Sequence, residues 1–212
     1  MADLTVYSDY VCPFCYLGFV SLQALEEQRG EKLAIDWKPF DLRRGQRDPD
    51  GELDESATTT KDESYYEQAR DNVRRLQEEY GAGEMLDPAE IPLSIDSRPA
   101  QIVSSYVKKY RREHWRAFDD ALFSALWEEG RDIGDVDTLE SVAQSVDLSP
   151  EIVGEALTDE SHRERVEKAF EHATQTGISG VPTFVRGDYV ARGAVPPDQL
   201  EELLVAGQSV TE

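Results

Sequence analysis

The chain has 212 residues, a length that favours one globular domain, or one domain carrying a large insertion, over a string of modules. Its 44 acidic and 22 basic side chains give a formal net charge of −22. This charge argues against nucleic acid as a partner, because phosphate binding needs a basic face, and against an anionic membrane surface for the same reason.

The acidic side chains are interpreted as the surface of a folded protein, because aromatic and β-branched residues recur along the chain. Carboxylates that repel one another are tolerated where salt screens them, within about 3 Å at 1 M. Since Arg is also preferred over Lys, we expect a protein from a halophile. The alternative is an ordinary acidic cytosolic protein.

The N-terminal residues show no basic segment followed by an apolar one, which a secretory signal requires. No stretch approaches the roughly 18 apolar residues of a membrane helix. We therefore expect a soluble protein of the cytoplasm.

The first forty residues predict the order strand, helix, strand. Residues 4–7 form a short β-prone run, and apolar residues at helical spacing extend from 13 to 28, where Gly30 closes the helix. Residues 33–40 alternate apolar and polar side chains, and Pro39 marks the end of this strand.

The middle of the chain predicts a helical block. Residues 41–60 are rich in Arg, Asp, Gly and Thr, which predicts a solvated and mobile loop. Helical patterns follow at 62–80, 99–113, 115–130, 137–146, 149–157 and 161–176. Ser149 before Pro150 predicts the N-cap of the fifth helix, and Thr158 or Ser161 predicts the start of the sixth.

The tail predicts two strands and a helix. Residues 183–185 and 189–191 flank a short hairpin connection at 186–188, and a final helix extends from 196 to 206. The predicted order is therefore β-α-β, a long helical insertion, then β-β-α, with no internal repeat.

The sequence holds two cysteines, in the motif Cys12-Pro13-Phe14-Cys15, which excludes a disulfide-rich secreted scaffold. The motif follows a strand and begins a helix, where unpaired backbone N–H groups and the helix dipole lower a thiol pKa. Cys12 is thus predicted to be the attacking sulfur, and Cys15, one turn later, to resolve the mixed disulfide. Pro13 suits the first turn because it lacks an N–H.

Two other uses of the cysteines stay open. They form half of a zinc site if two further ligands exist, but His114, His162 and His172 show no paired spacing with them. They are otherwise a packed pair of structural thiols. We expect neither a metal nor another cofactor, and we expect the three histidines to be exposed surface residues.

Three segments carry a resemblance to a known family. Residues 8–18, SDYVCPFCYLG, resemble the active-site segment of the DsbA-like thioredoxin-fold proteins, in particular the FrnE-like subfamily. Residues 177–184, GISGVPTF, resemble the loop that carries a cis-proline facing the C-x-x-C. The segment 121–135 resembles the insertion of the subfamily. The resemblance spans nearly the whole chain and is weakest between 43 and 93.

The resemblance implies a particular α/β fold. Residues 1–40 and 177–212 would form a thioredoxin-like domain, and residues 41–176 a large helical insertion. Such a core interrupted by helices gives the order of elements predicted above.

The resemblance also implies a substrate site around Cys12. The peptide bond between Val181 and Pro182 would be cis, and the backbone of Val181 would pair with an extended substrate strand. An ordinary trans proline turn is the alternative. The residues expected to contact substrate are Pro13, Phe14, Val181 and Pro182.

Two features near the cysteines depart from DsbA or modify the chemistry. Pro13-Phe14 lacks the histidine that DsbA places between its cysteines, so we expect a less oxidising couple than DsbA's, whose potential is about −120 mV. Asp9 precedes Cys12 by three residues, and its carboxylate raises the thiol pKa if it lies close.

Three further charged residues have open roles. Asp36, beside Trp37 on the second strand, is either a proton acceptor near the sulfurs or a solvent-facing residue. Arg98 and Arg131 either shape the groove and bind an anion or form structural ion pairs, the latter being expected in so acidic a protein.

The function implied is that of a thiol–disulfide oxidoreductase acting on protein or small-molecule thiols and disulfides. The alternative is a glutathione- or small-thiol-dependent enzyme like the 2-hydroxychromene-2-carboxylate isomerases and kappa-class glutathione transferases, which generally carry serine at the position of Cys12. A third possibility is a peptide-binding chaperone, with a groove between the insertion and the cis-proline loop. The sequence leaves substrate, direction of electron flow, redox partner and oligomeric state open.

Overall fold

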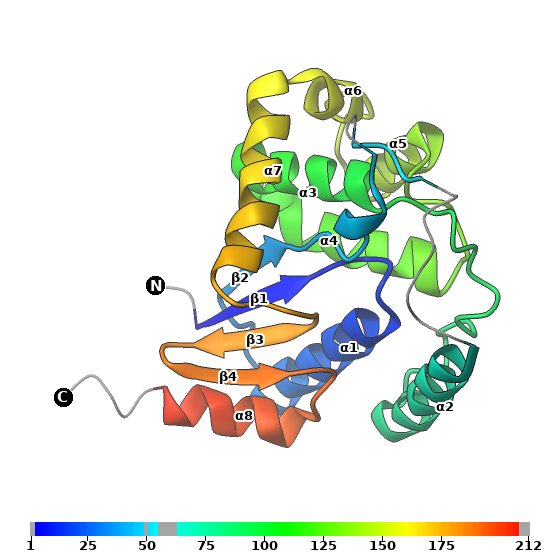
Figure 1. The fold of residues 1–212 in the computed structure, drawn as a ribbon. Helices are drawn as coiled ribbons and strands as arrows, with labels where there is room; N and C mark the ends of the chain where they lie inside the picture. The colour runs from blue at the N-terminus through cyan, green and yellow to red at the C-terminus, as the bar shows by residue number, and fades with distance from the viewer. Residues whose placement is uncertain (1–2, 49–50, 55–62, 208–212) are drawn as a thin grey trace.

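The computed structural model describes residues 3–48, 51–54 and 63–207 (Figure 1). Four strands form one mixed sheet in the order β2-β1-β3-β4. β1 (Leu4–Ser8) pairs in parallel with β2 (Ile35–Pro39) and antiparallel with β3 (Thr183–Arg186). β4 (Tyr189–Arg192) pairs antiparallel with β3. The predicted β-α-β and β-β-α order is confirmed.

Buried side chains that alternate along β1 place the middle of the sheet in the hydrophobic core. Leu4 and Val6 are buried, and Val6 lies in register between Trp37 on β2 and Phe184 on β3, both also buried. Because side chains alternate between the faces of a strand, this register places one apolar row in the core.

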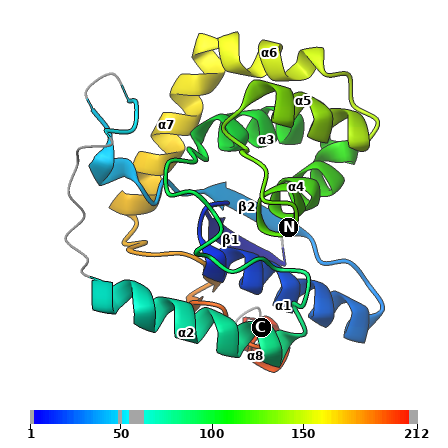
Figure 2. The same ribbon diagram turned by 90° about the vertical axis from the view of Figure 1, so that its right-hand side faces the viewer.

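The helices lie in two groups around the sheet. α1 (Pro13–Arg29) packs on α8 (Pro197–Ala206), which follows β4 at one edge of the sheet (Figure 1). α2 (Glu63–Tyr80) packs on α1, away from the other insertion helices (Figure 2). The other insertion helices lie beyond β2, and one of them, α7, contacts that strand. They are α3 (Arg98–Tyr110), α4 (Arg112–Trp127), α5 (Val136–Ser145), α6 (Glu151–Thr158) and α7 (Glu160–Gln175). The domain boundaries at 40 and 177 stay predictions.

Two predicted helix starts are wrong, whereas the end at Gly30 is confirmed. Gly30 is left-handed, with a φ of 68°, and its N–H bonds to the last turn of α1. Pro150, not Ser149, occupies the cap position of α6. Asp159 caps α7 by accepting from the His162 N–H, because the Thr158 hydroxyl still bonds back to Gly154 within α6.

The predicted solvated loop after β2 is partly wrong. A short 3-10 turn, η1 (Arg44–Gln46), is followed by Arg47, whose guanidinium is 8% exposed and lies between the carboxylates of Asp41 and Asp96. Asp41 is itself buried. Residues 49–50 and 55–60 of the predicted loop lie outside the described residues.

The three histidines differ in exposure. His172 is exposed, as predicted, and His114 is half-buried. His162 is buried, and that prediction is wrong: its Nε2 lies 3.1 Å from the carbonyl of Ile102, and its ring stands edge-on to Tyr106.

Across the described ranges, no helix combines the length and apolar character that a membrane span requires.

Candidate active site

Cys12 lies where β1 has ended and α1 begins. It occupies the N-cap position in an extended conformation, Pro13 is the first helical residue, and no side chain caps the helix. The Cys12 carbonyl accepts hydrogen bonds from the N–H groups of Cys15, at 2.9 Å, and Tyr16, at 3.3 Å. A thiolate on Cys12 therefore lies at the positive end of the helix.

The loop before β3 faces Cys12. The peptide bond between Val181 and Pro182 is cis, and not trans. The Cys12 Sγ lies 3.5 Å from the carbonyl oxygen of Val181. The first cysteine and the proline loop, 169 residues apart in the chain, thus meet at one site.

Gly18 permits the close approach of α1 to the proline loop, a role that was not anticipated from the sequence. A Cβ at Gly18 would lie 3.1 Å from Cζ of Phe184 and 3.2 Å from Cγ of Pro182. Both distances are below ordinary van der Waals contact, so a larger residue at this position forces the side chains of Phe184 and Pro182 to shift.

Cys15 lies one turn behind Cys12, and both are buried free thiols, 1% and 4% exposed. Burial raises the pKa of the Cys15 thiol well above its ordinary value, and the neighbouring Cys12 sulfur raises it further. The Ser8 hydroxyl and the backbone amide of Asp9 oppose this rise. Cys15 therefore stays protonated until a group nearby takes its proton.

The Asp9 carboxylate is held by three hydrogen bonds, none of which comes from a cysteine sulfur. It accepts hydrogen bonds from the Ser97 hydroxyl at 2.5 Å, from the Leu42 N–H at 2.8 Å and from the Val11 N–H at 3.3 Å. Burial nevertheless raises its own pKa to about 6. Asp9 thereby joins the active-site turn to the loop after β2 and to the start of α3.

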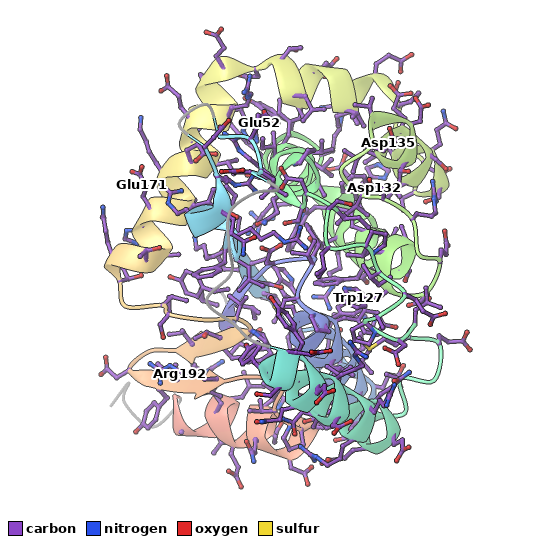
Figure 3. The ribbon with its side chains drawn as sticks, turned by 45° about the vertical axis from the view of Figure 1, so that its right-hand side comes forward. Glu52, Trp127, Asp132, Asp135, Glu171 and Arg192 are labelled. Carbon is purple, nitrogen blue, oxygen red and sulfur yellow. The ribbon has the colours of Figure 1, made fainter. Side chains whose placement is uncertain are left out.

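The turn between β1 and α1 is also anchored on α4. The Tyr10 hydroxyl donates to the carboxylate of Asp119, which also accepts from the Ser104 hydroxyl at 3.0 Å. The Tyr10 carbonyl accepts from Nε1 of Trp127 at 2.7 Å. Trp127, at the end of α4, lies over α1 next to Tyr16 (Figure 3).

Two exposed leucines, which the sequence did not single out, lie in segments that hydrogen bonds join to this turn. Leu42, whose N–H bonds to Asp9, is 41% exposed, and Leu93 is 74% exposed. The Arg43 guanidinium donates to the carbonyls of Leu93 and Ile95 and so holds the two segments together. Their signal in the sequence, isolated leucines in polar loops, is weak.

The other charged candidates have structural partners. Asp36 accepts from Lys38 and Lys108, which outweigh its burial and lower its pKa, so its carboxylate pairs with cations instead of acting on the sulfurs. Arg98 pairs with Glu167, and Arg131 with Glu129. In the part of the chain that is described, no group of three or more Cys, His, Asp or Glu is placed to hold a metal ion.

Comparison with known proteins gives the same fold. A family model for the DSBA-like thioredoxin domain matches residues 3–205. The chain is similar to the uncharacterized protein YwbO of Bacillus subtilis (strain 168), with 28% identity over 202 residues that cover 95% of this chain and 94% of the relative.

Solved structures are similar over nearly the full length. A probable DsbA oxidoreductase from Streptomyces coelicolor superposes with a TM-score of 0.70 at 20% identity, covering 99% of this chain and 91% of that one. A 2-hydroxychromene-2-carboxylate isomerase superposes with a TM-score of 0.73 at 21% identity, covering 98% and 95%. At such identities the likeness shows the fold, and the predicted α/β fold with its helical insertion is confirmed.

Proposed function

Because the chain belongs to the DsbA-like thioredoxin family, we propose that it is a thiol–disulfide oxidoreductase in which Cys12 and Cys15 exchange disulfides with protein or small-molecule thiols. One observation carries the proposal. Cys12 lies at the start of α1, 3.5 Å from the carbonyl before the cis-proline, and Cys15 is buried one turn behind it.

In the oxidising direction, a substrate thiolate attacks Cys12 Sγ of the oxidised protein. The bond between the two protein sulfurs breaks, and Cys15 leaves as a thiolate and takes up a proton. A second substrate thiolate then attacks the substrate sulfur of the mixed disulfide and releases Cys12. Two electrons pass from substrate to the cysteine pair, and reduction of a substrate is the reverse.

The buried environment of Cys15 affects both the oxidation and the reduction of a substrate. A thiol of raised pKa is a poor leaving group and attacks only after losing its proton. The Ser8 hydroxyl and the Asp9 amide favour the thiolate and so assist both steps.

The surface around Cys12 supports a peptide-like substrate. The Val181 carbonyl offers a backbone acceptor, and half-buried Phe14 offers an apolar contact. Exposed Leu42 is joined to the same turn through its hydrogen bond to Asp9. An extended segment bonded to the proline loop would place its own sulfur beside Cys12.

An equilibrium redox titration tests the proposal. The protein is equilibrated in thiol buffers, alkylated and mapped by mass spectrometry at Cys12 and Cys15. We expect an internal disulfide that forms reversibly between about −120 and −270 mV, the range of known oxidoreductases. We also expect Cys15→Ser, but not Cys12→Ser, to accumulate a mixed disulfide with substrate. Absence of both results would exclude the mechanism.

A second candidate function rests on the likeness to 2-hydroxychromene-2-carboxylate isomerase. In that case the site would bind a small thiol cofactor and act on a small electrophile. Tight binding of glutathione by Cys15→Ser, with turnover of such an electrophile, would favour this candidate over disulfide exchange.

We further propose that the protein acts in the cytoplasm, belongs to the FrnE-like subfamily and is adapted to high salt, in keeping with its net charge of −22. Unfolding midpoints measured from low to molar KCl test the last point: the midpoint of a salt-adapted protein rises steeply with salt.

A further inference from the structure

A cavity of about 210 Å³ lies between β2 and the helices α3, α4 and α7. None of Cys12, Cys15, Val181 and Pro182 lines it, but Ser8, whose hydroxyl faces Cys15, does, so the cavity adjoins the proposed exchange site. Aromatic side chains form much of its wall, namely those of Tyr10, Trp37, Trp115 and Phe123. The cavity is therefore shaped for a flat apolar body.

The cavity also gathers buried polar atoms that lack partners. Three buried side-chain atoms of its lining have no hydrogen bond among the described residues: Trp37 Nε1, Gln101 Oε1 and Asp119 Oδ2. Trp37, Gln101 and Asp119 are 8%, 4% and 3% exposed. Each such atom costs about 1–3 kcal/mol when left unpaired, so their concentration at one cavity points to polar groups that enter it.

Cations surround the cavity in a chain whose net charge is −22. Lys38, Lys108 and Arg165 all line it. Lys38 and Lys108 share the Asp36 carboxylate, whereas exposed Arg165 forms no ion pair within the described chain. Burial raises the pKa of Asp119, which favours its neutral form and weakens its repulsion of an anion.

We propose that this cavity binds a small aromatic carboxylate. The carboxylate pairs with Arg165 and Lys108, the ring packs between the aromatic side chains, and a hydroxyl on the ring reaches Gln101 and Asp119. The volume is below the about 300–1,000 Å³ of sites for drug-sized ligands, which limits the ligand to a single ring.

Trp37 and Trp115 in the wall provide the readout. Tryptophan fluorescence and calorimetry are followed while benzoate, 4-hydroxybenzoate or neutral benzamide is added to the full chain at constant ionic strength. We expect saturable one-to-one binding of the two carboxylates, tighter for 4-hydroxybenzoate. Benzamide should bind more weakly by about tenfold or more, since the charge-assisted contacts with Arg165 and Lys108 are lost.

Two pairs of variants on α7 localise the binding. Arg165→Glu reverses the charge at the cavity, while Arg163→Glu makes the same change on an exposed residue outside it. We expect Arg165→Glu to weaken binding by about tenfold or more and Arg163→Glu to change it little. Ala169→Leu fills the cavity and should abolish binding, whereas Lys168→Leu, at a residue outside it, should not.

The double variant Cys12→Ser, Cys15→Ser separates this site from the exchange chemistry. It lacks both reactive sulfurs, neither of which lines the cavity, and should bind 4-hydroxybenzoate as the native protein does. The proposal is overturned if no carboxylate binds saturably, which would leave a cavity that holds water alone, with room for about seven molecules. Binding that survives Ala169→Leu, or that is lost with the cysteines, also overturns it.

Discussion

The Ser97 hydroxyl donates a 2.5 Å hydrogen bond to the Asp9 carboxylate, although 88 positions separate the two residues in the chain. The bond joins the turn that carries Cys12 to the first residue before α3. A buried carboxylate with a single hydroxyl and two backbone donors is only partly compensated, and its pKa rises to about 6.

Asp9→Asn should therefore change how stability depends on pH. A folded-state pKa above the ordinary 3.8 means that the folded protein holds the proton more tightly, so this stabilising contribution is lost as pH rises through about 6. Relative to the native protein, Asp9→Asn should gain up to ~3 kcal/mol of unfolding free energy between pH 4 and pH 7. Urea unfolding at intervals of one pH unit measures the difference.

Asp36→Asn is a control for which the effect of pH on the unfolding free energy should have the opposite sign. The pKa of Asp36 is lowered because hydrogen bonds from Lys38 and Lys108 outweigh its burial. Its contribution is present above pH 4 and is lost as pH falls through the lowered pKa. If both variants shifted with pH in the same direction, the assignment of Asp9 as a destabilised carboxylate would be wrong.

Gly18→Ala should lower both stability and the exchange rate. The added methyl group would lie 3.1 Å from Phe184 and 3.2 Å from Pro182, at a cost of about 1–3 kcal/mol that outweighs the roughly 1 kcal/mol gained in helix propensity. Gly154→Ala on α6 is the matched control, since nothing lies within 4 Å of the added Cβ. It should stabilise the protein by about 0.8 kcal/mol, and equal effects of the two changes would refute the packing argument.

Arg47→Met should destabilise the protein severely. Its guanidinium is 8% exposed and bonds to Asp41 at 2.7 Å and to Asp96 at 2.8 Å, so its removal deprives the buried Asp41 carboxylate and the half-buried Asp96 carboxylate of their cation. A loss of about 3–5 kcal/mol is expected. Arg75→Met removes an exposed pair with Glu79 on α2 and should cost no more than about 0.5 kcal/mol. Denaturant unfolding compares the two, and a small effect at Arg47 would show that the carboxylates find other partners.

Cys15 should resist alkylation in the reduced protein. Burial and the neighbouring Cys12 sulfur raise the pKa of Cys15 well above its ordinary value, whereas Cys12, although also buried, lies at the positive end of α1. Iodoacetamide at pH 7 to 8 should therefore modify Cys12 first. In Cys12→Ser, the influence of the neighbouring sulfur is gone but burial remains, and the alkylation rate of Cys15 should still rise only at high pH. A Cys15 in that variant that reacts readily at pH 7 would contradict the buried environment.

Local patterns in the sequence predicted the order of elements and the helix end at Gly30, because each depends on neighbouring residues. The cis-proline loop was instead implied by the resemblance to the DsbA-like proteins. His162 was wrongly predicted to be exposed, because its neighbours in the sequence are charged. It shares a buried face with Val166, Phe170 and Ala173, at steps of four, four and three residues, which is the helical spacing that would have revealed it.

Contacts between distant segments were the part that the sequence could not predict. The pairing of Arg47 with Asp96 and of Asp9 with Ser97 depends on how the insertion folds back over the sheet. Composition alone made residues 41–60 look solvated, because an Arg and an Asp in a polar loop give no sign that they are buried together. The cavity between β2 and the helices α3, α4 and α7 is lined by residues from distant segments, so no short stretch of sequence predicts it.

Tyr10 shows why the insertion is inseparable from the cysteine pair. Its hydroxyl and its carbonyl are both held by α4, through Asp119 and Trp127, two residues before the first cysteine. A shortened protein with the helices deleted would leave these groups exposed and the turn before α1 without support. Sheet and insertion should therefore unfold as one cooperative unit, because the helical block fixes the conformation of the turn that carries the first cysteine.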